Sequence, residues 1–487
     1  MPPDINKYVS NTDRDIYTVS NLPEEVIAVI FAYVSRSPKS FRDNISTVIE
    51  EEQHGRERAI KFHEKWVLHY GHASVAEHAS VHVGVERVSR LFSSLLELTN
   101  EFLSFTEYSQ RYQKPQRGDF FIPPELDGRP ALKSEYTRLN DSLYEAYSEL
   151  NEGLFEWLKK ESPAPEGREE KTHFRALEKL AFEDARYALG LSTFTNLGMT
   201  GNARALEDAL SKLLSSPYPE ARLRAEEIKD EVSFSVPTLV KYANPSPYIV
   251  ETAKELTSMC QDITKQEHGK NSTGVTLLDW TGAHSDTPET EALEVIVSSV
   301  IFSYSNLSHR EVSELLEGKD PGHLTAVFKQ SIEKMGKFDN PAEALRLVNY
   351  RAEFVVSEAC WHQLLRHRKV KWITQEPTVI HGYLTPPSIV SSGLEEVLAR
   401  VVKNSEELYG KLMNESLHTV ASYVVTNAHL RRVMGSFDLW ELYHLINLRT
   451  SEGAQWDIKN VITTLAEEVS RYHPNLLKPA LKRVRGE

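Results

Sequence analysis

The two halves of the chain carry the same features in the same order, and this internal repeat constrains the fold more than any other property of the sequence. In the first half, TNEFLSFTEYSQRY begins at Thr99 and leads to a Pro-Pro ending at residues 122–124. In the second half, RHRKVKWITQEPTV begins at Arg366 and leads to a similar ending at residues 385–387. A chain of 487 residues is long enough for two cores. The repeat therefore predicts two similar domains.

The boundary between these domains is predicted near the middle of the chain. The segment ANPSPY at residues 243–248 combines proline with small polar residues, which is typical of a connection between structural units. We expect an N-terminal domain over residues 1–244 and a C-terminal domain over residues 245–487, joined by a linker at about 243–275. These two domains are called the first copy and the second copy below.

Helical periodicity dominates both copies. Apolar residues recur at three- and four-residue steps over residues 23–35, 132–160 and 459–474, which predicts amphipathic helices. The segment at residues 79–86 instead alternates, with its valines at every second position, which predicts a strand with one face in the core. The predicted fold class is α+β, rich in helix.

The composition limits the partners of the protein. Lysine and arginine together number 56 against 70 aspartate and glutamate residues, so a nucleic acid partner, which requires a basic face, is not expected. No apolar run approaches the ~20 residues that span a bilayer, and the N-terminal segment shows no targeting pattern, so we expect a cytoplasmic protein with no membrane partner. Two cysteines, Cys260 and Cys360, exclude a disulfide framework, and neither is a convincing nucleophile.

One basic cluster stands out on this acidic chain. Arg366, His367 and Arg368 are consecutive and follow an apolar segment that includes Gln363. If HQLLRHR is helical, Gln363, Arg366 and His367 share one face. Such a cluster alone is most often a solvated helix end. The matched spacing in the other half of the chain favours a binding site.

The motifs around this cluster are similar to those of the flavin-dependent thymidylate synthases, the ThyX family. The family signature is Arg-His-Arg, seven further residues and then Ser-x-Arg-Tyr, usually preceded by GHxSxxEH. The first copy carries GHASVAEH (71–78), SQRY (109–112) and EDARYALGLSTFTNLGMTGNARALE (183–207). The second copy carries HQLLRHR (362–368) and LINLRTSEGAQWDI (445–458). The chain resembles two fused copies, and each implied domain is an antiparallel sheet with packed helices.

The two copies keep complementary parts of the signature. Residues 99–101 of the first copy read Thr-Asn-Glu in place of Arg-His-Arg, but Ser109 and Arg111 follow in the family register. The second copy keeps Arg-His-Arg and has Glu376 at the position of the serine. Family members resemble homotetramers whose sites lie between subunits. The resemblance therefore implies sites shared by both copies, in a homodimer that forms a pseudo-tetramer.

The resemblance also implies an activity, the reductive methylation of dUMP to dTMP with FAD as cofactor and with NADPH and methylenetetrahydrofolate as co-substrates. Arg366 and Arg449 are the implied catalytic residues, because fixed guanidinium groups stabilise charge that develops on uracil. The implied substrate-binding residues are Glu107, Ser109, Arg111, Arg186, Gln363, Arg366 and Arg449. The implied FAD-binding residues are His72, Ser74, Glu77, Asn202, Arg204, His367 and Arg368.

Other interpretations of these residues remain open. Arg449 is also compatible with a helix-end charge, and Arg111 with a surface loop. The histidines between residues 63 and 82 fit no zinc spacing, so no metal is expected. For the whole chain, the alternatives are a flavin-dependent enzyme that acts on another pyrimidine, and a non-catalytic scaffold of the same fold that binds nucleotide or flavin.

Overall fold

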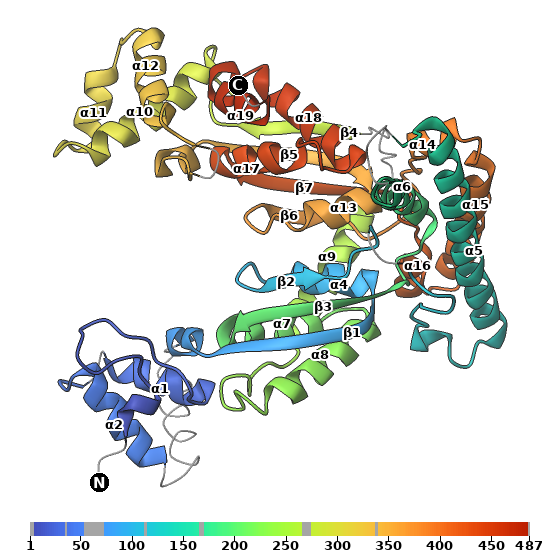
Figure 1. Ribbon diagram of the computed structural model, residues 1–487, viewed down its shortest axis with the longest axis horizontal. Helices are drawn as coiled ribbons and strands as arrows, with labels where there is room; N and C mark the ends of the chain where they lie inside the picture. Colours follow the sequence, from blue (N-terminus) through green and yellow to red (C-terminus); the bar gives the residue numbers. More distant parts are fainter. Residues whose placement is uncertain are drawn as a thin grey trace. The chain divides into compact units, whose positions relative to one another are not determined.

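The computed structural model divides into two compact units (Figure 1). It describes residues 4–34, 37–52, 73–111, 114–164, 170–264, 274–336 and 339–485. Unit 1 comprises Met1–Arg138 and Leu191–His268, and unit 2 comprises Leu139–Gly190 and Gly269–Glu487. Residues 139–190, from the first copy, thus belong to the unit that holds the second copy. The division at residue 244 concerns the sequence repeat, and it stays a prediction.

Unit 1 is built on an antiparallel sheet with the strand order β1-β3-β2. Its strands are β1 (Ser80–Ser89), β2 (Ser104–Glu107) and β3 (Phe194–Asn202). Its helices are η1 (Ile5–Lys7), α1 (Glu24–Val34), α2 (Phe41–Glu52), η3 (Ala73–His78), α4 (Arg90–Glu97), η4 (Pro124–Leu126), α7 (Ala203–Leu214), α8 (Pro219–Val232) and α9 (Pro247–Thr264). Helices α4, α7 and α8 pack against this sheet (Figure 1).

Unit 2 is built on a second antiparallel sheet, with the strand order β4-β5-β7-β6. Its strands are β4 (Gly274–Trp280), β5 (Asn349–Ser357), β6 (Lys371–Thr374) and β7 (Leu430–Asp438). Its helices are α6 (Glu170–Ala185), η5 (Arg186–Ala188), α10 (Pro288–Ser303), α11 (His309–Leu316), α12 (Pro321–Ile332), η6 (Glu343–Leu347), α13 (Glu358–Leu364), α14 (Pro387–Ser391), α15 (Glu395–Asn414), α16 (His418–Val424), α17 (Leu439–Arg449), α18 (Trp456–Ser470) and α19 (Pro474–Arg485). Helix α5 (Pro130–Glu161) begins in unit 1 and continues into unit 2.

The predicted fold class is confirmed, and so are the individual segments on which it rested. The alternating valines lie in β1, where Val81 and Val85 are buried. The periodic segments at residues 23–35 and 132–160 form α1 and α5, and most of the third forms α18. The predicted linker at about 243–275 is not all irregular, because it contains the helix α9.

The two sheets have the same register, which supports the repeat read from the sequence. The matching pairs are Ser80–Asn202 with Asn349–Asp438, and Ser104–Thr200 with Lys371–Ser436. The offset between copies is 236 residues from β3 to β7 (Asn202 to Asp438) and 267 residues from β2 to β6 (Ser104 to Lys371). The second offset also carries Thr99 onto Arg366, as the motif alignment predicts.

The same helix caps recur in both copies. Ser89 ends β1 and its side chain accepts a hydrogen bond from the Phe92 N–H, which starts α4. Ser357 ends β5 and accepts in the same way from the Cys360 N–H, which starts α13. A side-chain oxygen at this position satisfies an amide that has no partner inside the helix. The caps therefore fix where α13, the helix of the basic cluster, begins.

Segments at equivalent positions of the two copies also pair with each other inside unit 2. Gly190 and Thr426, which are related by the offset of 236, form an antiparallel bridge. The Asn427 N–H donates to the Leu189 carbonyl over 2.8 Å. This pairing ties the end of residues 139–190 to the second copy.

Candidate functional site

The basic cluster follows helix α13 and does not lie on it. The helix ends at Leu364, so Gln363 is helical while Arg366 and His367 lie in the turn that follows. The prediction that Gln363, Arg366 and His367 share one helical face is therefore wrong. The chain turns after Leu364 because it must enter β6, which pairs with β7. In this turn Arg366 is half-buried, His367 is buried and Arg368 is exposed.

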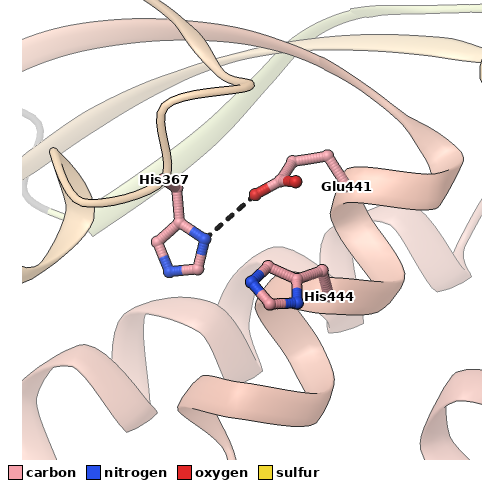
Figure 2. A group of neighbouring side chains, drawn as sticks. All are labelled: His367, Glu441 and His444. Carbon is pink, nitrogen blue, oxygen red and sulfur yellow. Dashed lines mark hydrogen bonds and ion pairs between the residues drawn. The ribbon is translucent and has the colours of Figure 1, made fainter. Parts of the chain in front are cut away.

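His367 is held from both sides of its ring, and Figure 2 shows the side that faces Glu441. Its Nδ1 lies 2.9 Å from Glu441 Oε1, and its Nε2 lies 2.9 Å from Arg449 Nε. Arg449 always carries its proton, so Nε2 accepts and Nδ1–H donates to Glu441. Burial, and then the charge of Arg449, lower the pKa of His367 to about 3. His367 is therefore a neutral acceptor that holds the guanidinium group of Arg449 in place.

His367, Glu441 and His444 form a group whose geometry resembles a metal site, with Glu441 and His444 one turn apart on α17 (Figure 2). The tautomer of His367 argues against a metal there. Nδ1 carries the proton and so has no lone pair for a cation. Moving that proton to Nε2 would set it against the N–H of Arg449. We therefore interpret this group as a hydrogen-bonded network.

Gln363 belongs to a second buried network, which joins residues of both copies within unit 2. Its Nε2 lies 3.2 Å from Gln455 Oε1, and Gln455 Nε2 lies 3.2 Å from Tyr187 Oη. Tyr187 Oη in turn donates to Asp457 Oδ2 over 2.7 Å. Gln363 Oε1 is buried and accepts no hydrogen bond within the part of the chain that the structure describes. The network thus fixes Gln363 and leaves one acceptor for a ligand N–H group.

The positive charges of Arg186 and Arg449 both influence the buried thiol of Cys360. Burial raises the pKa of the Cys360 thiol well above its usual value, and the charges of Arg449 and Arg186 partly oppose this shift. Charges that influence one buried thiol lie in one neighbourhood. Arg449 contacts α13 directly through the Gln363 carbonyl, and Arg186 precedes Tyr187, which is joined to Gln363 through Gln455. The thiol itself stays protonated, which agrees with the expectation that no cysteine acts as nucleophile.

In unit 1, Glu107 forms a buried ion pair with Arg90. Its Oε1 lies 2.5 Å from Arg90 Nη1, and the two side chains are only 1% and 6% exposed. Glu107 also accepts a hydrogen bond from the hydroxyl of Thr195 on β3. Ser109 and Arg111 follow just beyond β2, both half-buried, with the Arg111 N–H donating to Ser109 Oγ. The ion pair therefore anchors the strand that presents Ser109 and Arg111.

Replacing Arg90 by alanine is expected to lower the free energy of unfolding by about 3–5 kcal/mol, because it leaves the Glu107 carboxylate buried without its cation. The matched control is Lys133→Ala, which removes an exposed pair with Asp127 and should cost less than about 1 kcal/mol. Urea denaturation followed by circular dichroism measures both changes. Equal losses in the two variants would contradict the anchoring role.

Three of the five first-copy residues that were predicted to bind FAD line a pocket of about 460 Å³ in unit 1. Glu77, Asn202 and Arg204 line it, together with Asn100 and Phe102. Asn202 is the N-cap of α7, and Arg204 forms an ion pair with Glu77 on η3.

Two further FAD-side residues were predicted in the same stretch of the first copy. Ser74 lies exposed on η3. The predicted His72 lies outside the described residues.

The predicted site residues thus form two sets. Unit 1 holds Glu107, Ser109, Arg111 and the pocket residues, and unit 2 holds Arg186, Gln363, Arg366, His367, Arg368 and Arg449. Sequence reasoning did not single out Tyr187, Gln455 or Asp457, which position Gln363. Their signal was present, because Gln455 and Asp457 belong to the AQWDI segment and Tyr187 follows Arg186.

A comparison with known protein families accounts for the repeat. The family described as thymidylate synthase complementing protein, Thy1, matches residues 17–238 and again residues 286–475. The chain belongs to the Thy1 family. Two matches within one chain are what a tandem fusion predicts, and they agree with the shared register of the two sheets.

Relatives of this Thy1 chain fall into two groups. Full-length relatives include a UPF0159 protein of Thermoplasma acidophilum, 25% identical over 91% of this chain and 93% of that protein, and a UPF0159 protein of Chlamydia muridarum, 22% identical over 96% and 92%. A flavin-dependent thymidylate synthase of Clostridium tetani is 30% identical and covers 46% of this chain and 83% of its own. It corresponds to about one copy.

Among solved structures, a flavin-dependent thymidylate synthase ThyX of Helicobacter pylori complexed with FAD and dUMP aligns with 43% of this Thy1 chain and 99% of its own, with 15% identity and a TM-score of 0.32. Within the described ranges, no helix is both long enough and apolar enough to cross a membrane.

Proposed function

We propose that this chain is a flavin-dependent thymidylate synthase, which converts dUMP to dTMP by reductive methylation. The observation that carries the proposal is a chain of hydrogen bonds inside unit 2, which joins Arg449 and Gln363 of the second copy, through Gln455, to Tyr187, the first-copy residue that follows Arg186. The family resemblance assigns Gln363, Arg449 and Arg186 to the nucleotide. The network of Gln455, Tyr187 and Asp457 holds Gln363, and His367 with the Gln363 carbonyl holds Arg449.

The chemistry of these residues suits dUMP. Guanidinium groups bind a phosphate dianion through two parallel hydrogen bonds, which is the role that we propose for Arg186 and that the family resemblance also gives to Arg111 with Ser109. The uracil ring offers an imide N–H, and Gln363 Oε1 is a buried acceptor without a donor among the described residues. Arg449 and Arg366 would stabilise the negative charge that develops on the uracil carbonyl oxygen during attack by C5.

The residues present also fit the flavin. The unit 1 pocket offers amide, cationic and aromatic groups, and its volume of about 460 Å³ has room for part of FAD. When bound, FAD supplies the hydride chemistry. Glu77, Asn202 and Arg204 would hold it. The family resemblance also assigns Ser74, His72 and Arg368 to the flavin. His367 was predicted to contact the flavin, but both its nitrogens are bonded within the protein, so we assign it the positioning of Arg449.

The rest of the proposed reaction follows the family. Methylenetetrahydrofolate would supply the carbon and NADPH the reducing equivalents. Two chains would combine into a homodimer of four Thy1 domains.

The proposal is tested with the purified full chain. We expect a yellow protein that takes up FAD and releases the C5 hydrogen of labelled dUMP when methylenetetrahydrofolate and NADPH are present. Separate expression of the two copies is unsuitable, because a cut near residue 244 would remove residues 139–190 from unit 2. UMP and dCMP serve as control substrates.

The outcomes separate the alternatives. A yellow protein without dUMP-dependent release would favour an enzyme that acts on another pyrimidine. A colourless protein that takes up no FAD would favour a scaffold without catalysis.

A further inference from the structure

The shared register of the two sheets allows the unit 1 pocket to be compared, position by position, with the same place in unit 2. Helix α7 begins as α17 does, since the Ala203 N–H donates to the Ala79 carbonyl and the Leu439 N–H donates to the Val348 carbonyl. The short helices η3 and η6 each end two residues before the first strand of this comparison. Glu77 therefore corresponds to Arg346, and Arg204 corresponds to Trp440.

None of the residues compared at this place is retained in unit 2. The unit 1 residues are Glu77, Asn100, Phe102, Arg204, Ala205 and Asp208. Their counterparts, in the same order, are Arg346, His367, Lys369, Trp440, Glu441 and His444. The changes include a larger side chain in place of alanine and an indole ring in place of a flexible arginine.

In unit 1 the side chains surround an open space. Arg204 pairs with Glu77, and Asn100 Nδ2 lies 2.8 Å from Asp208 Oδ2. Asp208 also accepts from Lys212, so the polar groups are drawn toward α7. A pocket of about 460 Å³ remains between these groups.

In unit 2 the counterparts contact one another. The Arg346 guanidinium lies 3.6 Å from the centre of the Trp440 ring, and Lys369 Nζ lies 4.9 Å from it. Cations held this close to an indole face are attracted by its π electrons. His367, in the segment after α13, contacts both Glu441 and His444 of α17, with the ring centroids of the two histidines 5.4 Å apart (Figure 2). The side chains that would have to face a ligand in unit 2 are therefore in contact with one another.

We propose that each chain binds one flavin and not two: the unit 1 pocket takes it, and Trp440, packed against Arg346, closes the equivalent place in unit 2. This inference rests on the proposed function, because it concerns the flavin of that site. The physical reason is that a ligand in unit 2 would have to displace the indole ring and separate the His367–Glu441 pair, which also holds Arg449. The duplicated chain would thus carry half the flavin sites expected of two intact copies.

The ratio of flavin to chain tests the inference. Saturated protein is separated from free FAD and denatured, and the released flavin is measured by absorbance against the chain concentration. We expect one flavin per chain. Two flavins per chain would overturn the inference and leave the proposed function standing. No bound flavin would overturn both.

Two matched double variants test which unit holds the flavin. Glu77→Arg with Arg204→Trp installs the unit 2 residues in unit 1, and we expect the ratio to fall from one to near zero. Arg346→Glu with Trp440→Arg makes the reverse exchange and should keep at least one flavin. An unchanged ratio in the first variant, or loss of flavin in the second, would overturn the assignment. Thermal unfolding of each variant verifies that it is folded.

Discussion

Replacing Arg449 by alanine is expected to lower dUMP-dependent activity by about 10²–10³-fold, the usual effect of removing one preorganised donor from an active site. Arg449 donates to His367 Nε2 and, over 3.0 Å, to the Gln363 carbonyl oxygen. It is thus held by Gln363 and His367, which lie on either side of Arg366 in the chain. Arg449→Lys should lose most of the activity as well, since an ammonium group lacks the planar fork of a guanidinium.

Two measurements separate this effect from loss of folding. The matched control is Arg310→Ala, an arginine on α11 whose side chain is 89% exposed, and it should keep full activity. In Arg449→Ala, the pKa of His367 should rise above about 3, because one of the two causes that lower it is removed. It should stay below 6.5, because the ring remains buried. An active Arg449→Ala variant, or a His367 pKa that does not rise, would contradict the positioning scheme.

Replacing Asp457 by alanine is expected to lower the free energy of unfolding of unit 2 by about 3 kcal/mol, since two buried hydroxyl groups lose their acceptor at about 1–3 kcal/mol each. These groups are Tyr187 Oη and Ser357 Oγ. Apart from Trp66, the tryptophans belong to unit 2, so intrinsic fluorescence during urea denaturation follows this unit. The comparison variant Asp457→Asn keeps one oxygen acceptor and should lose less.

The difference in the free energy of unfolding between the natural chain and Asp457→Asn should depend on pH. Burial raises the pKa of Asp457, although hydrogen bonds from Ser357 and Tyr187 partly oppose the shift. A carboxyl group with a raised pKa stabilises the fold most below its unfolded value of about 3.9, and this stabilisation is lost as the pH rises through the folded pKa. The amide of Asp457→Asn does not titrate. Its deficit relative to the natural chain should therefore shrink as the pH rises, and a deficit that grows with pH would contradict the assignment.

Much of the site could be predicted from sequence because the repeat preserved spacing. The offset that carries Thr99 onto Arg366 is also the offset between β2 and β6. The sequence alone therefore predicted correctly which residues of the two copies correspond. Spacing did not give the end of α13. HQLLRHR has helical periodicity, yet the helix ends at Leu364, because the residues that follow must lead into β6, which pairs with β7.

The sequence also did not predict which residues of the site are buried. His367 reads as a cation beside two arginines, but the fold surrounds it with Glu441 and Arg449 and keeps it neutral. Tyr187 and Asp457 are 270 residues apart and meet only because residues 139–190 pack into unit 2. No local pattern reports such a contact.

The sequence by itself determined that the chain is a repeat, which residues correspond between its copies and which copy kept each part of the signature, because these properties depend on order and spacing along the chain. Only the tertiary structure decided that residues 139–190 join the second copy, that His367 supports Arg449, and that Trp440 closes one of two equivalent places. Those outcomes depend on which side chains are buried together, and burial is set by contacts between segments far apart in the chain.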